Sequence, residues 1–106
     1  MTILELADAC ERAKGADGLL DVAIGNACGF RSHGDGYGAP PFTGSLDAAM
    51  RLVPEGVSWE MSVGDSTSAP FAFSCCIDRR FEGRNASPAL ALVAAALRAR
   101  HAMESE

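Results

Sequence analysis

Three arginines surround a phenylalanine in the stretch "DRRFEGR" and form a cluster of positive charge. Arg79, Arg80 and Arg84 carry guanidinium groups, whose planar N–H forks match the oxygens of a phosphate. Phe81 lies among them and supplies a ring on which a base can stack. The cluster predicts a site for an anionic, nucleotide-like small molecule. The alternative is a surface loop whose arginines pair with the neighbouring carboxylates.

A second candidate is the segment "HGDGYG", residues 33–38, inside a glycine- and proline-rich loop over residues 29–44. His33 and Tyr37 are its candidate ligand contacts. One His and one Asp are too few ligands for a metal centre. The glycines lack the preceding strand and following helix of a dinucleotide-binding turn. We therefore expect no cofactor or metal here, and either a flexible connection or a lid that closes over the arginine cluster.

Length and charge limit the classes of protein that this chain can belong to. Its 106 residues suffice for one domain, residues 1–106, and its net charge of −5 disfavours broad binding to nucleic acid or to anionic membranes. The longest apolar run, residues 89–97, is too short to span a bilayer, and the first ten residues do not read as a signal peptide. We expect a soluble cytoplasmic protein. Its four cysteines show no CxxC spacing, which indicates buried thiols.

Apolar residues at helical spacing predict two short N-terminal helices. The first covers residues 3–14 and stops at Gly15; the second covers residues 19–28 and is capped by Asp17. A connection this short predicts a helical hairpin.

The centre of the chain predicts a short helix and then a hairpin of strands. Ser45 caps the helix and Pro54 ends it, with Leu46, Ala49, Met50 and Val53 as its buried side. Alternating apolar residues predict strands over 57–63 and 71–77. The next segment, residues 78–86, is either a second loop or a third strand.

Ser87 and Pro88 mark the start of the last helix, because a serine cap followed by proline is a strong helix start. This helix runs to about Met103, and residues 104–106 should fray. Since residues 89–97 are apolar on all sides, the helix should be buried against the sheet and against another helix or subunit. The predicted fold is α+β, with helices packed on a small antiparallel sheet in an α/β/α sandwich-like arrangement.

Two blocks of sequence resemble the phage αβα-sandwich domain family, small accessory proteins of tailed phages and prophages. They are "PPFTGSLDAAMRLVPEGVSWEM", residues 40–61, and "NASPALALVAAALRAR", residues 85–100. The resemblance implies a phage or prophage gene, a location in the bacterial host's cytoplasm and α/β/α layering. It implies no agreed chemistry and supplies no catalytic residue.

Three classes of function follow from these observations. The first is a non-enzymatic, homo-oligomeric binding protein, such as a counter-defence protein that sequesters a nucleotide immune signal or inhibits a host defence protein. The second is a protein-interaction module in phage morphogenesis or regulation. The third is a small enzyme acting on an anionic nucleotide-like metabolite. We favour a non-enzyme, because the sequence has no recognisable acid–base or nucleophile motif.

Overall fold

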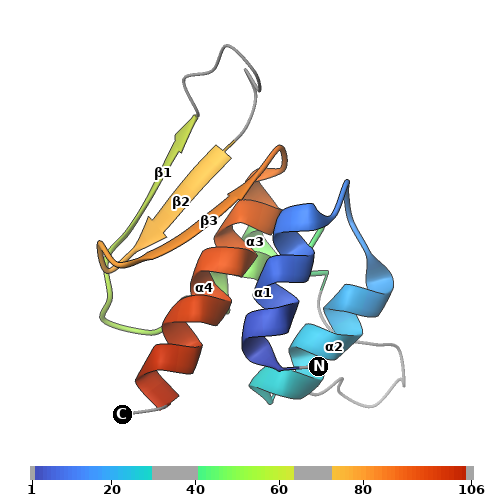
Figure 1. Ribbon diagram of the computed structural model, residues 1–106, viewed down its shortest axis with the longest axis horizontal. Helices are drawn as coiled ribbons and strands as arrows, with labels where there is room; N and C mark the ends of the chain where they lie inside the picture. Colours follow the sequence, from blue (N-terminus) through green and yellow to red (C-terminus); the bar gives the residue numbers. More distant parts are fainter. Residues whose placement is uncertain (1, 30–40, 64–72, 105–106) are drawn as a thin grey trace.

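Four helices and one three-stranded sheet make up the fold (Figure 1). The computed structural model describes residues 2–29, 41–63 and 73–104. The elements in chain order are α1 (Ile3–Arg12), α2 (Gly18–Cys28), α3 (Leu46–Met50), β1 (Trp59–Val63), β2 (Phe73–Ile77), β3 (Phe81–Asn85) and α4 (Pro88–Glu104). The strands are antiparallel in the order β1-β2-β3, with Met61 opposite Cys75 and Cys75 opposite Gly83. The predicted α+β class is confirmed, and residues 81–85 are the third strand.

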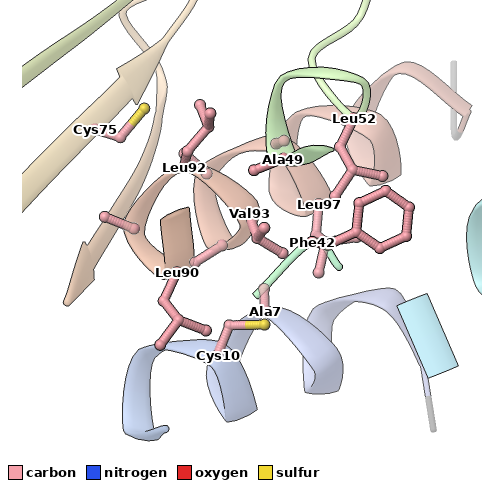
Figure 2. Close-up of a cluster of buried hydrophobic side chains, with 14 of the residues drawn as sticks. Ala7, Cys10, Phe42, Ala49, Leu52, Cys75, Leu90, Leu92, Val93 and Leu97 are labelled. Atoms are coloured by element: carbon pink, nitrogen blue, oxygen red, sulfur yellow. The ribbon is translucent and has the colours of Figure 1, made fainter. Parts of the chain in front are cut away.

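Helix α4 is the centre of the core. It packs across β2 and β3 on one side and against α1 and α3 on the other (Figure 1). Every residue from Ala89 to Leu97 is buried, as the all-round apolar pattern predicts. Leu90, Leu92 and Val93 point in different directions from this helix (Figure 2). The expected burial against both the sheet and another helix is confirmed.

Gly83 allows the closest approach between α4 and the sheet. A β-carbon added at this position would clash with the Ala91 carbonyl oxygen and stand 2.6 Å from the Ala95 amide nitrogen. Strand β3 therefore touches the backbone of α4 directly, which only glycine permits here.

Side-chain caps fix the helix starts. Asp17 accepts from the amides of Leu19 and Leu20, and Ser45 accepts from Ala48, as predicted. Ser87 accepts from the Leu90 amide at 3.4 Å. Thr2, which the sequence reading passed over, forms a reciprocal capping box with Glu5 at the start of α1.

Several predicted boundaries were wrong. Helix α1 ends at Arg12 rather than residue 14, and Ala13 rather than Gly15 caps it, because Ala13 has turned to extended backbone with ψ 143°. Glu104 belongs to α4 instead of the frayed tail. Strand β1 begins at Trp59, two residues later than predicted, and the described part of the second strand begins at Phe73.

The end of the predicted flexible loop belongs to the core. Phe42 is fully buried and Thr43 is 1% exposed. The Thr43 hydroxyl accepts from the Asp17 amide and lies 2.8 Å from Asp21 Oδ1, which also accepts from the Thr43 amide. These bonds attach residues 41–44 to the start of α2, so this part of the chain is held in place.

Helix α3 turns a different face inward than predicted. Leu46 was expected to be buried but is 41% exposed, and Ala48 takes its place beside Ala49. The Phe42 and Leu52 side chains fill the space next to α4 (Figure 2). In a helix of five residues a small rotation moves a side chain from core to solvent.

Candidate functional site

The arginine cluster begins at the turn between β2 and β3. The Arg80 amide donates to the Ile77 carbonyl at 3.1 Å and closes the turn. Asp78 and Arg79 both have positive φ, 55° and 59°, the pattern of a type I′ turn. Such turns normally carry Asn-Gly, because a side chain in the left-handed region costs about 1–2 kcal/mol. Asp tolerates this region better than most residues, whereas Arg has no such advantage.

Arg80 is engaged within the turn. Its guanidinium lies 3.0 Å from the Asp78 carboxylate and 4.9 Å from the centre of the Phe81 ring. Both charged side chains are about half exposed, 58% and 45%, so the pair contributes little to stability. For Arg80, the structure agrees with the alternative of pairing between neighbours.

Arg79 has no such contacts. It is exposed at the tip of the turn, and among the described residues no carboxylate pairs with it. Arg79 therefore presents its side chain to solvent one residue before Arg80. Within the predicted cluster, the contact that the structure shows is that of Arg80 with the Phe81 ring.

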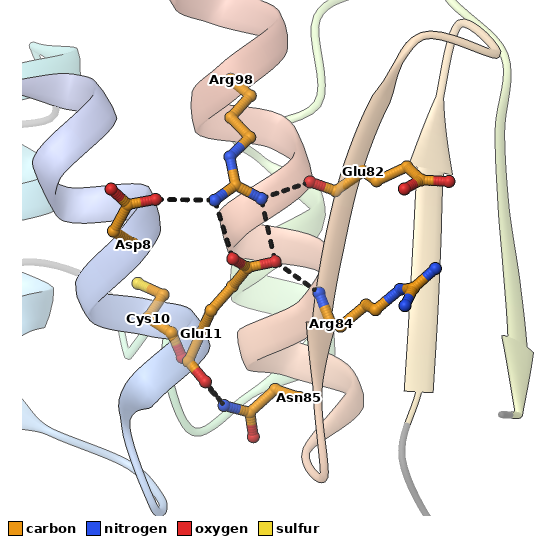
Figure 3. Close-up of polar contacts among 7 residues, drawn as sticks. All are labelled: Asp8, Cys10, Glu11, Glu82, Arg84, Asn85 and Arg98. Carbon is orange, nitrogen blue, oxygen red and sulfur yellow. Dashed lines mark hydrogen bonds and ion pairs between the residues drawn. The ribbon is translucent and has the colours of Figure 1, made fainter. Parts of the chain in front are cut away.

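Arg84 lies apart from the turn. It is exposed on strand β3, four residues beyond Arg80, which corresponds to about 13 Å of extended chain. Its side chain extends away from α1 in Figure 3. His33 and Tyr37 lie outside the described residues, so their place relative to the turn stays a prediction.

A second charged cluster, which the sequence reading did not identify, joins α1, α4 and β3 (Figure 3). Arg98 lies 2.8 Å from Asp8 and 2.8 Å from Glu11. It also donates to the Glu82 carbonyl at 2.6 Å, and the Arg84 amide donates to Glu11 at 3.0 Å. The Arg98 bond is the main reason that the pKa of Glu11 is lowered from 4.5. The carboxylates of Asp8 and Glu11 are engaged by Arg98, so the cluster holds α1, α4 and β3 together.

Asn85 completes this structural cluster. Its side-chain amide donates to the carbonyls of Cys10, Glu11 and Ala13 at 2.9, 3.1 and 2.9 Å. These carbonyls lie in the last turn and at the cap of α1, where a helix runs out of its own backbone donors. The Cys10 carbonyl also accepts from the Ala13 amide at 3.3 Å. The Asn85 oxygen accepts from Ser87, so one side chain links the end of α1 to the start of α4.

Three of the four cysteines, Cys10, Cys28 and Cys75, are poor candidates for a reactive thiol. Burial raises the pKa of Cys10 to about 12 and that of Cys75 to about 11, and it also raises that of Cys28. A neutral thiol is a poor nucleophile. Within residues 2–29, 41–63 and 73–104 no three His, Cys, Asp or Glu side chains group as metal ligands.

The surface also has a shallow hollow beside α3, of about 410 Å³, far from the arginine turn in sequence. Pro41, Ser45, Asp47, Ala48 and Arg51 line it. It is open, and its two charged residues have opposite sign. Ser45 is already used as a helix cap, which leaves no base or nucleophile arrangement there.

Comparisons with models of protein families, with curated proteins and with solved structures find no match for this chain. The resemblance to the phage family therefore stays a prediction from the sequence blocks. No helix of the described residues has the length and apolar character that crossing a membrane requires.

Proposed function

We propose that this chain is a non-catalytic binding protein that holds an anionic, nucleotide-like small molecule at the β2–β3 turn. The observation that supports it most is Arg79. This residue occupies a backbone conformation that favours glycine, and it presents an unpaired guanidinium, within the described residues, on a protein of net charge −5. Strain retained at an exposed residue is typical of binding sites. The Arg79 side chain makes no stabilising contact with the described residues, and binding of a ligand would explain why an arginine stands at this position.

The contacts of Arg80 and Phe81 suit such a ligand. The guanidinium groups of the consecutive residues Arg79 and Arg80 offer several N–H donors to phosphate oxygens. A phosphate would compete with the Asp78 carboxylate for Arg80, at small cost because that pair is solvent-exposed. Release of Arg80 would leave the Phe81 ring for stacking on a base.

In its finer form, the proposal is that the protein is phage-encoded and sequesters a nucleotide immune signal in the host cell. This form rests on the resemblance of residues 40–61 and 85–100 to the phage family. Several of those residues have structural roles here, since Ser45 and Ser87 are caps. Their presence supports a fold shared with the phage family. The proposal for the ligand rests on the β2–β3 turn alone.

Isothermal titration calorimetry with cyclic nucleotides and ADP-ribose derivatives tests the proposal. At least one should bind the native protein, and Arg79→Gly should weaken that binding at least tenfold, the loss of one charge-assisted contact. Arg12→Gln, which removes an exposed arginine from α1, is the matched control and should bind normally. Absence of heat with every nucleotide, or equal binding by Arg79→Gly, would contradict the proposal.

A protein-interaction module is the second candidate, and helix α2 supports it. Leu19 is 84% exposed and Val22 is 43% exposed on that helix, an unusual amount of apolar surface for one short element. A host or phage protein captured in stoichiometric amount by the native chain but not by Leu19→Ser would favour this function. Analysis of the nucleotide recovered after denaturing the protein distinguishes an enzyme from these two candidates. Only an enzyme would return a cleaved nucleotide.

A further inference from the structure

The two edges of the sheet differ in how their backbone groups are satisfied. On the β3 edge, the Arg84 amide donates to the Glu11 carboxylate and the Glu82 carbonyl accepts from Arg98. Side chains of α1 and α4 thus close this edge (Figure 3), so no further strand can add there.

The β1 edge has no such cover among the described residues. The Ser58 carbonyl accepts from the Asp78 amide at 2.8 Å. The backbone N–H and C=O groups of residue 58 and of every second residue after it therefore point toward β2. Trp59, Met61 and Val63 therefore direct their backbone N–H and C=O groups away from the sheet. In Figure 1, β1 is the outermost strand, on the side opposite the helices that flank β3.

We propose that β1 pairs antiparallel with β1 of a second copy, around a two-fold axis at Met61. In this register Met61 faces Met61 of the other copy, and Trp59 faces position 63. All three free positions then exchange backbone hydrogen bonds, about six in total. The two sheets become one sheet of twice the width, which is a closed, isologous dimer.

Charge and the number of backbone groups that pair together favour this register over its neighbours. It places Glu60 opposite Ser62 of the other copy, on the face of the sheet that is turned away from α4. A two-fold axis at Glu60 would put two carboxylates directly opposite one another, which is destabilising. With a two-fold axis at Ser62, only residues 61 and 63 of the three outward-pointing positions would exchange backbone hydrogen bonds. The Met61 register avoids both costs.

This dimer goes beyond the proposed ligand site and does not depend on it. The β2–β3 turn lies next to Ser58, at the start of β1. Antiparallel pairing puts the two turns at opposite ends of the joint sheet, where each stays open to a ligand. Loss of the dimer and loss of ligand binding are therefore separate results.

Sedimentation equilibrium of charge variants tests the register. Ser62→Glu places a carboxylate opposite Glu60 twice per dimer and should raise the dimer dissociation constant roughly two- to thirtyfold. The double variant Glu60→Lys with Ser62→Glu places Lys opposite Glu twice and should restore the dimer to native strength or better. Ser74→Glu, with the same charge change one strand away from the edge, is the control and should leave the constant unchanged. Thermal unfolding of each variant confirms that the fold is intact.

Trp59 gives an independent readout because it is the only tryptophan of the chain, and it is 39% exposed at this edge. Its emission should shift to shorter wavelength as the native protein dimerises, and much less so in Ser62→Glu. A native protein that stays monomeric up to about 1 mM would overturn the proposal. So would a dimer that Ser62→Glu leaves unchanged, or one that the double variant fails to restore.

Discussion

Strands β3 and β1 border the same sheet, yet they are held in opposite ways. β3 contacts the α4 backbone at Gly83, and Glu11, Arg98 and its own Asn85 link it to helices on the other side. β1 pairs only with β2 within the described residues. Its sequence has the cleanest apolar alternation in the chain, whereas "FEGRN" of β3 has almost none. Apolar alternation indicates that a strand forms, while individual polar contacts decide how firmly it is anchored.

The largest expected effect comes from separating β3 from α4. Gly83→Ala should lower the free energy of unfolding by about 3 kcal/mol, because the added methyl group meets backbone atoms of Ala91 and Ala95 that cannot move independently. Urea denaturation measures the change. Gly15→Ala, whose added methyl group has no atom within 4 Å, should change stability by less than about 1 kcal/mol. Equal effects of the two substitutions would show that the close approach is not tight.

The next effect comes from Asn85, which ties β3 to the end of α1. Asn85→Asp replaces the donor to three carbonyls with a negative oxygen at the negative end of the helix dipole. We expect a loss of about 2–3 kcal/mol in urea denaturation, larger than that of Asn85→Ala. If Asn85→Ala is the more damaging variant, packing rather than hydrogen bonding anchors this residue.

Glu11→Gln should cost about 2 kcal/mol near neutral pH, because it weakens the bonds to Arg98 and the Arg84 amide. The pKa of Glu11 is lowered in the folded protein from its ordinary 4.5, chiefly by Arg98. The contribution of this carboxylate is therefore complete above about pH 4.5 and is lost as the pH falls through the lowered value. The stability difference between native protein and variant should shrink on acidification. A difference that is constant from about pH 6 to about pH 3 would assign the effect to packing.

The smallest effect has the opposite sign and concerns the open side of the sheet. Asp78→Asn with Arg79→Gly creates the preferred pair for a turn with two positive φ values. Thermal unfolding should show a gain of about 1 kcal/mol, while binding of an anionic ligand falls. A destabilised double variant would mean that Arg79 serves the fold.

The sequence predicted the elements well because their signals are local. Caps at Asp17, Ser45 and Ser87 act over three residues, and the all-apolar run of α4 has no other place than the core. The predicted helix ends were less accurate. Helix α1 ends before Ala13, whose carbonyl accepts a hydrogen bond from Asn85, 72 residues away along the chain. Local pattern carries no information on such a contact.

The same reason explains what was missed around the candidate site. Arg98 binds Asp8 and Glu11, which are 90 and 87 residues away along the chain, and no local pattern around Arg98 indicates these partners. The arginine cluster was predicted as a unit. The structure keeps Arg79, Arg80 and Phe81 at the turn, while Arg84 lies farther along β3. The sequence identifies a cluster of positive charge. The geometry of the turn and of β3 is needed to separate the arginines at the turn from Arg84.

An amide chemical-shift titration by NMR with each nucleotide of the calorimetric panel tests the central claim most directly, because it locates the ligand. At least one nucleotide should shift the amides of Asp78, Arg79 and Arg80 and leave those of Glu11 and Arg98 unmoved. Arg79→Gly should need at least tenfold more nucleotide to reach the same shifts, while the protein stays folded. The claim is contradicted if no nucleotide moves the turn, or if the largest shifts surround the hollow beside α3.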